Sequence, residues 1–347
     1  MKAVHLTGLR KMKIVEIDEP TLRRDDEVLL RVDVVGVCGS DVHTYAEGGI
    51  GGSAVQYPWI LGHECAGTVL EVGPAAGGVK VGQRVAVDPL IPCNRCDQCR
   101  SGRKHTCRNQ KFLASPGQAA GALVERLVMP AECCYGLPDS VTLVQATLAE
   151  PLSIGLHARN LSGLGGGTAA ILGCGPIGLC VLLAIKQAGP TKVFATDLID
   201  ERLAMARHLG ADWTARADRG DVVAAAGRAA PEGMDCVFEC AGKQETVDQA
   251  IAMSRPGGKV VLVGIPSEDR IELDIHTARR RELTLQSVRR QNRCLQPAID
   301  LVAGGQVNVD SLATDHFDLA QAQEAFEMVA DYRDGVIKAM IHMGKAT

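Results

Sequence analysis

The stretch ILGCGPIG, residues 171–178, decides the fold of this 347-residue chain. It carries the pattern G-x-G-x-x-G, and the apolar residues 169–172 that lead into it are typical of a buried strand. A proline suits the first turn of a helix, and the sequence that follows is apolar to residue 188. Strand, glycine-rich turn and helix in this order predict a dinucleotide-binding unit, with cofactor contacts at Gly173, Gly175, Pro176, Ile177 and Gly178.

Each glycine of the turn has its own task. Gly173 permits the tight turn, Gly175 lets backbone N–H groups approach a pyrophosphate, and Gly178 lets helix and sheet pack closely. Asp197 follows the next apolar run, where its carboxylate can accept hydrogen bonds from the adenosine ribose and repel a 2′-phosphate. We therefore expect NAD as the cofactor, although Arg202 is within reach of the same ribose and weakens the discrimination against NADP.

Apolar runs and helix-length segments alternate from here to residue 288, which predicts a doubly wound α/β domain with a parallel sheet. The first 90 or so residues instead show short runs with period-two alternation, for example residues 28–35, which indicate a β-rich domain. The tail is expected to end with a helix over residues 319–330 and an alternating strand over 336–342; it is too short for a domain of its own and should pack onto that first half. We expect a β-rich domain of residues 1–152 completed by 291–347, and a coenzyme domain of residues 153–290.

The composition excludes several classes of protein. Hydrophobic residues make up 46% of the chain and the net charge is −4, so there is material for two cores and no global field to attract nucleic acid or anionic lipid. No run approaches the ~18 uninterrupted apolar residues of a membrane helix, and we expect no membrane partner. Charged residues interrupt the N-terminus, which argues against a signal peptide and for a cytoplasmic protein. The 13 cysteines are then candidate metal ligands.

Four cysteines stand close together in a polar segment, within an expected lobe of residues 90–110. Cys93, Cys96, Cys99 and Cys107 have the spacing C-x2-C-x2-C-x7-C, which can close a tetrahedral structural zinc site. An iron–sulfur cluster is the nearest rival, but the bacterial ferredoxin pattern has a three-residue gap before its last cysteine and a proline after it. Basic residues around the lobe raise the question of nucleic-acid binding, but no aromatic residue is interleaved for stacking, so we expect no nucleic-acid partner.

A second set of metal-ligating residue types is scattered along the chain. Cys38 follows a predicted strand and leads into a turn, His63 and Glu64 lie just ahead of another strand, and Glu150 comes much later. One thiolate, one imidazole and one or two carboxylates are the three protein ligands that a catalytic zinc keeps while leaving a place for water or substrate.

Together these stretches resemble the zinc-dependent medium-chain dehydrogenases, and within them the polyol or sorbitol dehydrogenase branch. The matching segments span nearly the whole chain in order: VCGSDVH (37–43), LGHECAGTV (61–69), the cysteine lobe (93–107), AEPLSIGLHA (149–158), GCGPIG (173–178) and LVGIPSE (262–268). Glu150 discriminates between branches, because the alcohol dehydrogenase branch typically has cysteine there. The resemblance implies a GroES-like catalytic domain, formed by both ends of the chain, and an inserted Rossmann coenzyme domain.

The resemblance also implies roles for single residues. Cys38 and His63 match ligands of the catalytic zinc; Glu64 and Glu150 compete for the third place, one binding the metal and the other holding its water. Asp41 would support His63, while Ser40 and His43 match a proton relay that passes through the nicotinamide ribose. The remaining cofactor contacts are expected at Val263, Ile265, Val288 and Arg289, with Arg290 as an alternative to Arg289.

The resulting expectation is an enzyme with two zinc ions per chain that oxidises a secondary alcohol, a polyol or sugar alcohol, with hydride transfer to NAD. The relay histidine is followed by Thr44 and then Tyr45, whereas this branch has tyrosine directly after the histidine, so cyclitols, amino-polyols and L-threonine-like substrates stay open. A zinc-free quinone or enone reductase on the same scaffold is a further alternative, since it would not need the open-site set. The family usually forms dimers or tetramers, and we expect a homo-oligomer, with a homotetramer favoured.

Overall fold

The computed structural model describes residues 1–189 and 191–344 of the chain. It divides into two compact units, one made of Met1–Glu150 with Leu295–Thr347 and the other of Pro151–Cys294. The expected completing segment 291–347 includes residues 345–347, which lie outside the described residues. Across the described ranges, no helix is both long and apolar enough to cross a bilayer.

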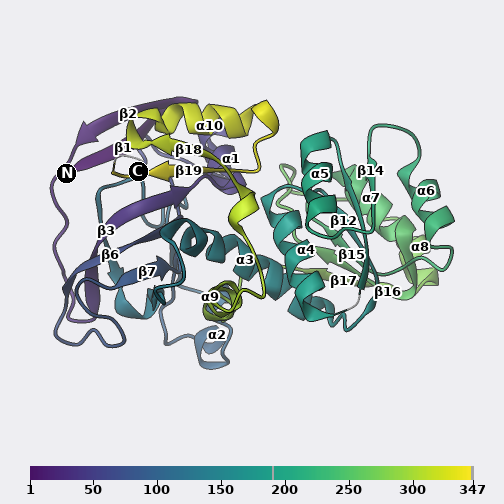
Figure 1. Cartoon of the computed structure of the whole chain (residues 1–347), viewed down its shortest axis with the longest axis horizontal. Helices are drawn as coiled ribbons and strands as arrows, with labels where there is room; N and C mark the ends of the chain where they lie inside the picture. Colours follow the sequence, from purple (N-terminus) through teal and green to yellow (C-terminus); the bar gives the residue numbers. More distant parts are fainter. Residues whose placement is uncertain (190, 345–347) are drawn as a thin grey trace. The chain divides into compact units, whose positions relative to one another are not determined.

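The first unit is built on a seven-stranded sheet with the order β11-β7-β6-β3-β19-β18, in which β10 also pairs with β3. Neighbouring strands are antiparallel except for β18 and β19. In Figure 1 the yellow C-terminal strands lie beside the purple strand β3, although some three hundred residues separate them. The strands of this sheet are β3 (Glu27–Gly36), β6 (Glu64–Val72), β7 (Arg84–Val87), β10 (Arg126–Pro130), β11 (Cys134–Gly136), β18 (Ala313–Asp318) and β19 (Lys338–His342).

Three small two-stranded sheets complete the β structure of this unit: β1 (Lys2–Gly8) with β2 (Lys11–Glu16), β4 (Gly49–Ile50) with β5 (Ser53–Ala54), and β8 (Leu90–Ile91) with β9 (Lys111–Phe112). Its helices are α1 (Gly39–Glu47), α2 (Asp97–Arg100), the first half of α3 (Leu143–Ser162), α9 (Leu295–Ala303) and α10 (Ala322–Ala330). Val28, Leu30, Val32 and Val34 of β3 are all buried, which is the alternation that the sequence predicts for this strand.

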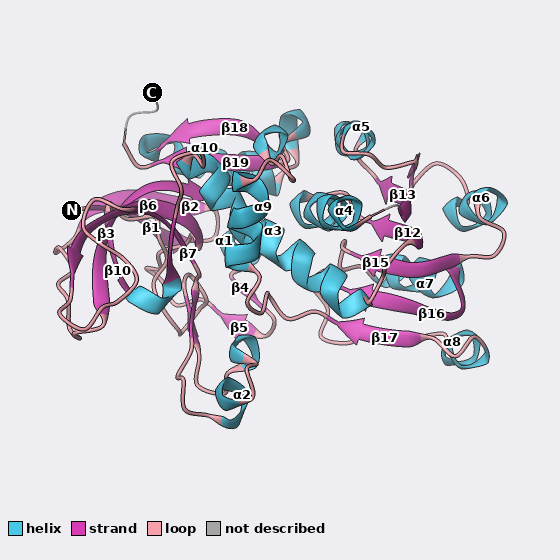
Figure 2. Cartoon of the chain, turned by 60° about the horizontal axis from the view of Figure 1, so that its bottom comes forward, coloured by secondary structure: helices cyan, strands magenta, loops and turns pink. Residues whose placement is uncertain are grey.

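The second unit is a six-stranded parallel sheet with the order β14-β13-β12-β15-β16-β17 (Figure 2). In chain order this is 3-2-1-4-5-6, the arrangement of a dinucleotide-binding fold, and the order in which successive strands are added reverses between β12 and β15. The strands are β12 (Gly167–Leu172), β13 (Thr191–Asp197), β14 (Trp213–Arg216), β15 (Met234–Glu239), β16 (Ser254–Leu262) and β17 (Thr284–Ser287). The carboxyl ends of all six strands therefore meet at one edge.

Helices connect these strands: α4 (Pro176–Ala188), α5 (Asp200–His208), α6 (Val222–Ala229), α7 (Gln244–Met253) and α8 (Ile275–Arg280). Helix α4 packs with α5, and α7 packs with α6 and α8. Alanine, valine, leucine and isoleucine dominate the buried side chains, since the chain has few aromatic residues to fill its cores. Every residue of helix α4 from Gly178 to Ile185 is buried, so this part of the helix is covered on all sides.

Two expectations about local structure are corrected here. The residues after Cys38 form the helix α1 instead of a turn, and Cys38 is its N-cap residue. Helix α1 has only nine residues, too few for a hydrophobic period to stand out in the sequence. The strand expected at 336–342 begins two residues later, at Lys338, and the helix expected at 319–330 starts with a short 3-10 turn over Leu319–Gln321.

Candidate metal centres and coenzyme site

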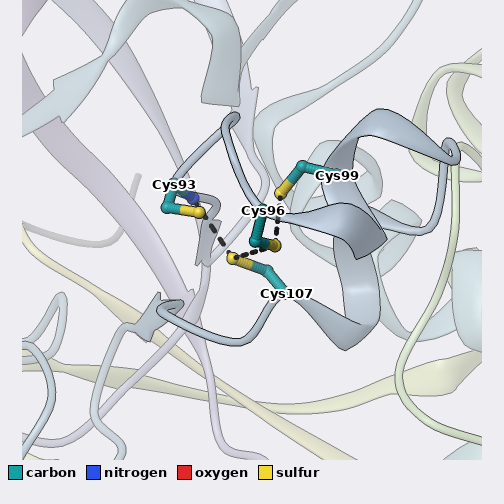
Figure 3. A group of neighbouring side chains, drawn as sticks. All are labelled: Cys93, Cys96, Cys99 and Cys107. Carbon is teal, nitrogen blue, oxygen red and sulfur yellow. Dashed lines mark hydrogen bonds between the residues drawn. The ribbon is translucent and has the colours of Figure 1, made fainter.

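The four cysteines of the lobe converge on one point, as Figure 3 shows. The Cys96 Sγ atom lies 3.6 Å from that of Cys99 and 3.9 Å from that of Cys107. Four sulfurs at about 2.3 Å from a tetrahedral zinc are about 3.8 Å from one another, so the observed spacing fits this ion. Among residues 1–189 and 191–344 no further His, Cys, Asp or Glu joins the group, and a site closed by four thiolates is typically structural.

The backbone of the lobe prepares the thiols for metal. Hydrogen bonds from the backbone of Arg95 and Cys96 lower the pKa of Cys93 to about 6, and the backbone N–H of Cys99 lowers the pKa of Cys96. Burial instead raises the pKa of Cys99 to about 12. All four thiols must lose their protons to bind zinc. In the metal-free lobe Cys99 keeps its proton near neutral pH, and zinc binding removes it.

Two of the basic side chains around the lobe are paired with carboxylates of the same unit. Arg108 makes a bidentate contact with Asp97 at 2.6 and 2.9 Å, and Lys104 lies 2.8 Å from Glu132. These two side chains are therefore already paired and are less available to the phosphates of a nucleic acid.

The second metal-competent group consists of Cys38, His63 and Glu64, whose ligand atoms all lie within 4.8 Å of one another. Cys38 stands at the junction of β3 and α1, and Glu64 opens β6, the strand paired with β3. Pairing of these strands thus brings together residues that are separated by 25 positions in the chain. All three side chains can coordinate a divalent metal, and one coordination position remains for another ligand.

Asp41 fixes the orientation of His63. Its Oδ2 atom lies 2.9 Å from His63 Nδ1, and both side chains are buried. Burial opposes a proton on His63, but Asp41 and Cys38 together raise its pKa well above the usual value in the metal-free chain. Because Asp41 holds Nδ1, the Nε2 atom is free to face a metal, and the carboxylate makes the imidazole a stronger ligand.

A buried lysine from the other end of the chain holds Glu64. Lys338 Nζ lies 2.8 Å from both carboxylate oxygens and also donates to the carbonyl of Val37 at 3.2 Å. The Lys338 and Glu64 side chains are 1% and 0% exposed. A side chain at Gly36, opposite in the sheet, would come within 2.5 Å of Glu64 Oε2, so glycine leaves the space that this carboxylate occupies.

Glu150 lies beside this group, but its carboxylate oxygens are not within 4.8 Å of all three of the other ligand atoms. It is on α3, directly before Pro151, where the two units divide. Burial raises its pKa to about 8; His63 and Lys338 oppose the shift, while Glu64 and Asp88 add to it. The structure therefore brings together three of the four expected residues and places the fourth as a neighbouring carboxyl group.

The two expected relay residues occupy successive turns of α1. Ser40 Oγ donates to Cys38 Sγ at 3.3 Å. His43 is partly exposed and its Nδ1 lies 3.0 Å from Glu47 Oε2. Ser40 thus touches the metal-competent group, whereas His43 reaches solvent.

The glycine-rich turn has the geometry that the sequence predicts. Gly173 has φ = +97°, and a side chain there would come within 3.0 Å of the Ala241 amide nitrogen. At Gly178 a Cβ atom would lie 1.9 Å from the Gly173 carbonyl oxygen. Over Gly175, in contrast, the nearest atom is Arg202 Nη1 at 3.6 Å, so the space above this residue is open. An open N-terminus of α4 is suited to the pyrophosphate of a dinucleotide.

Asp197 ties this turn to the end of β13. Its Oδ2 accepts from the Cys174 amide at 2.6 Å, and its Oδ1 accepts from the amides of Leu198 and Ile199 at 2.7 and 2.9 Å. A carboxylate has about four acceptor positions, so room remains for a ribose hydroxyl. Asp197 has a structural task in addition to the one expected from the sequence.

The other expected cofactor residues lie at the same edge of the sheet. Ile177 is in the first turn of α4, Val263 and Ile265 follow β16, and Val288 and Arg289 follow β17. Arg289 is exposed and makes no hydrogen bond or ion pair to any described residue. The neighbouring Arg290 has φ = +53° and does have a partner, so Arg289 is the freer of the two guanidinium groups.

Known proteins resemble the chain over both units. The family model "Alcohol dehydrogenase GroES-like domain" matches residues 24–139, and "Zinc-binding dehydrogenase" matches residues 176–304. Sorbitol dehydrogenase of Bacillus subtilis is 36% identical over 344 residues, which cover 99% of this chain and 97% of that protein. L-idonate 5-dehydrogenase of Vitis vinifera is 36% identical over 350 residues, which cover 98% of this chain and 94% of that protein. An Escherichia coli alcohol dehydrogenase crystallised with NADH has a TM-score of 0.91 at 27% identity, covering 99% of each chain.

The fold and the two metal-competent groups together are those of a metal-dependent oxidoreductase with a dinucleotide-binding domain. The chain belongs to the zinc-dependent medium-chain dehydrogenase family, in its polyol dehydrogenase-like branch. The predicted fold class, a GroES-like domain with a Rossmann coenzyme domain, is confirmed. The protein is an enzyme of a zinc-binding dehydrogenase family, and solved structures similar to it have been crystallised with NADH or with NADP.

Sequence reasoning missed three residues that shape these sites. Lys338 gives no local signal, because its partner Glu64 is 274 residues away. Glu239 ends β15 and could have been found by the rule that ligands bind at the carboxyl ends of parallel strands. Its Oε1 accepts from the amides of Ala241 and Gly242 and from Thr246 Oγ1, all within 2.8 Å, and so fixes the turn that packs on Gly173.

Tyr45 is the third. Its ring is fully buried, and its hydroxyl donates to Glu327 Oε1 on α10 at 2.6 Å. The side chain therefore serves the core between α1 and α10, and it does not stand in for the tyrosine that this branch has one position earlier.

Proposed function

We propose that the enzyme oxidises a secondary hydroxyl of a polyol or sugar alcohol to the ketone. The observation that carries the proposal is the open group of Cys38, His63 and Glu64 with the carboxyl group of Glu150 beside it, since one thiolate, one imidazole and one carboxylate leave a position for a substrate hydroxyl. Relatives named sorbitol dehydrogenase and L-idonate 5-dehydrogenase support a polyhydroxy substrate.

In this proposal Cys38, His63 and Glu64 hold the catalytic zinc, and Cys93, Cys96, Cys99 and Cys107 hold a structural one, giving two zinc ions per chain. When bound, the catalytic ion supplies a Lewis acid to the substrate hydroxyl, and NAD accepts the hydride. Lys338 neutralises Glu64 and fixes its two oxygens, Asp41 orients His63, and Glu150 holds water or a substrate hydroxyl at the remaining position.

The proton released by the hydroxyl leaves through Ser40 and His43. Ser40 Oγ contacts Cys38 Sγ, and His43 is one helical turn further on and partly exposed. The two ring nitrogens of a histidine can accept a proton on one side and release one on the other, which suits a group that passes protons to water. Glu47 lies against its Nδ1 atom and so leaves Nε2 for the proton transfer.

NAD is held by residues 153–290, which we assign as the coenzyme domain, with residues 1–152 and 291–347 as the catalytic domain. Gly173, Gly175, Pro176, Ile177 and Gly178 receive the pyrophosphate, Asp197 and Arg202 the adenosine ribose, and Val263, Ile265, Val288 and Arg289 the nicotinamide half. The open space above Gly175 and the unpaired Arg289 support this assignment.

Replacing Asp197 tests the ribose contact. We expect Asp197→Ala to shift the preference from NAD toward NADP, because the repulsion of a 2′-phosphate is removed. The substitution also leaves three backbone amides without their hydrogen-bond acceptor, so the melting temperature should fall. The ratio of kcat/KM for the two cofactors is the measurement, and an unchanged ratio in a folded variant would remove Asp197 from the ribose site.

A panel assay and a metal count test the function as a whole. We expect two zinc ions per chain and NAD reduction with polyols, and we expect activity to disappear when the open-site zinc is lost and to return when zinc is added back. Sorbitol, xylitol, cyclitols, amino-polyols and L-threonine in one panel separate the substrate classes. Full activity in protein that holds only the lobe zinc would contradict the proposal and point to the zinc-free enone reductase, which the metal-competent group does not favour.

We also propose a homo-oligomer, a dimer or tetramer, that pairs its coenzyme sheets. The edge strand β17 and the exposed side chains of Ile275 and Leu273 support this arrangement, since an unpaired edge flanked by apolar residues is a ready pairing surface. Light scattering of the wild type and of Ile275→Lys measures the subunit number. A monomeric wild type would contradict the assignment.

The cytoplasm is the compartment we propose. All 13 cysteines are free thiols, and four of them form a metal-competent group, which requires a reducing environment. Fractionation of the source cells with a thiol count tests this, and disulfides in the native protein would contradict it.

A further inference from the structure

Two histidines of the catalytic unit, distant from both metal groups in the sequence, point at each other on neighbouring strands. His316 Nδ1 lies 2.9 Å from His342 Nε2, and the two ring centroids are 5.2 Å apart with the planes tilted by 35°. The strands β18 and β19 are parallel, and their pairing places His316 opposite Met340 and Asp318 opposite His342. His316 is exposed and His342 half-buried, so solutes can reach the pair.

We propose that His316 and His342 form a third metal site, which takes a divalent transition ion with a preference for square or octahedral coordination, such as nickel(II). Two nitrogens at about 2.1 Å from one ion and 2.9 Å from each other subtend an angle of roughly 90° at the ion. A tetrahedral ion would require about 3.4 Å between the nitrogens, so the spacing favours nickel(II) or copper(II) over zinc.

The electronic state of the pair suits a metal. Burial and the neighbouring His316 lower the pKa of His342, which keeps that ring neutral and its lone pair available near neutral pH. In the metal-free chain one ring donates the proton that the other accepts. When an ion binds, the donating ring moves this proton to its other nitrogen, so both rings stay neutral and no proton is released.

Asp318 adds negative charge on the same side. It acts on His342 electrostatically and favours a cation there. Strand pairing holds the two rings at a fixed spacing, so the ion does not have to order the backbone when it binds. Water completes the coordination, since within residues 1–189 and 191–344 no third His, Cys, Asp or Glu ligand atom converges with these two nitrogens.

Calorimetric titration of the zinc-loaded enzyme with nickel(II) tests this site. Nickel is preferred to copper, because copper(II) would oxidise the free thiols. We expect one nickel per chain, and His316→Ala or His342→Ala should each weaken its binding by at least roughly tenfold, since even the loss of a supporting partner has that effect. His276→Ala, which removes an exposed histidine on α8, is the matched control and should bind nickel like the wild type.

A second measurement needs no variant. Acylation of histidines with diethylpyrocarbonate, followed by mass spectrometry, should modify the wild type at His316 or His342, and nickel should protect these two rings while His276 continues to react. Nickel binding of undiminished affinity in both alanine variants, or equal protection of all three histidines, would overturn the site.

Discussion

The cysteine lobe and the open metal group illustrate two ways of building a metal site. Within the lobe all four ligands fall within 15 residues, and a short helix and a 3-10 turn bring them together. The open group takes its ligands from two paired strands, and its charge balance comes from Lys338, at the far end of the chain. A local site can be closed and structural, whereas a site assembled by tertiary contacts can keep a free position and surround it with buried charges.

Removing a lobe ligand should have the largest effect. We expect Cys99→Ala to yield insoluble or unfolded protein, because a structural zinc contributes folding free energy directly. Cys180→Ala, at a fully buried cysteine outside both metal groups, is the control and should remain soluble. Soluble yield and zinc content are the measurements, and a stable Cys99→Ala enzyme with normal turnover would show that the lobe is dispensable.

Removing an open-site ligand should instead abolish activity and spare the fold. We expect Cys38→Ser to retain one zinc per chain and to lose kcat by about a thousandfold, since Lewis-acid stabilisation is worth several kcal/mol and each ~1.4 kcal/mol is a factor of ten. Cys133→Ala, a buried cysteine outside both groups, should keep both ions and its activity. If Cys38→Ser unfolded and Cys99→Ala remained folded, the open site and not the lobe would support the fold, which would contradict the roles assigned to the two metal groups.

The third prediction concerns the buried ion pair. We expect Lys338→Met to lower the free energy of unfolding by about 3–5 kcal/mol, because Glu64 is then a buried charge without its partner. Lys186→Met breaks a surface pair with Asp212 and should change stability by less than about 1 kcal/mol. Denaturant titration compares the two, and equal effects would mean that Lys338 does not neutralise Glu64.

The smallest effect is a pH dependence in zinc-free protein. Glu150 has a pKa of about 8 in the folded chain, above its value in the unfolded chain, so between these values only the folded state holds the proton. Stability should be highest below the unfolded pKa and should decline as the pH rises toward 8. Melting temperatures measured across this range should fall less in Glu150→Gln than in the wild type or in the surface control Glu201→Gln. Parallel curves for all three would show that burial does not hold that proton.

Local patterns were sufficient to predict the glycine-rich turn and the strand and helix on either side of it. The spacing of Gly173, Gly175 and Gly178 predicted a strand, a turn and a helix, because glycines at this spacing are typical of the tight turn that leads from a buried strand into a helix. Helix α1 was missed, since nine residues carry too short a period, and the short strands β8 and β9 of the lobe were missed for the same reason.

The open site could be predicted only in its ligand types. Cys38, His63 and Glu64 were identified as candidates, but Glu150 could not be ranked against Glu64, because the choice depends on which carboxylate the strand pairing brings within reach of the other two. The sequence predicted that Asp197 binds ribose. It did not predict the hydrogen bonds that Asp197 accepts from three backbone amides, because these depend on the three-dimensional path of the turn.

The sequence by itself determined the chemistry: which side chains can bind metal, where the dinucleotide turn lies, and that the four lobe cysteines belong together. The dinucleotide turn and the cysteine lobe depend on short spacings, within which covalent geometry limits the possible arrangements, whereas the ligands of the open site were recognised by residue type and by the resemblance. Only the tertiary structure decided which distant groups meet, namely Lys338 with Glu64, His316 with His342 and Tyr45 with Glu327. These pairs arise from strand pairing and helix packing across the chain, and no local pattern in the sequence encodes them.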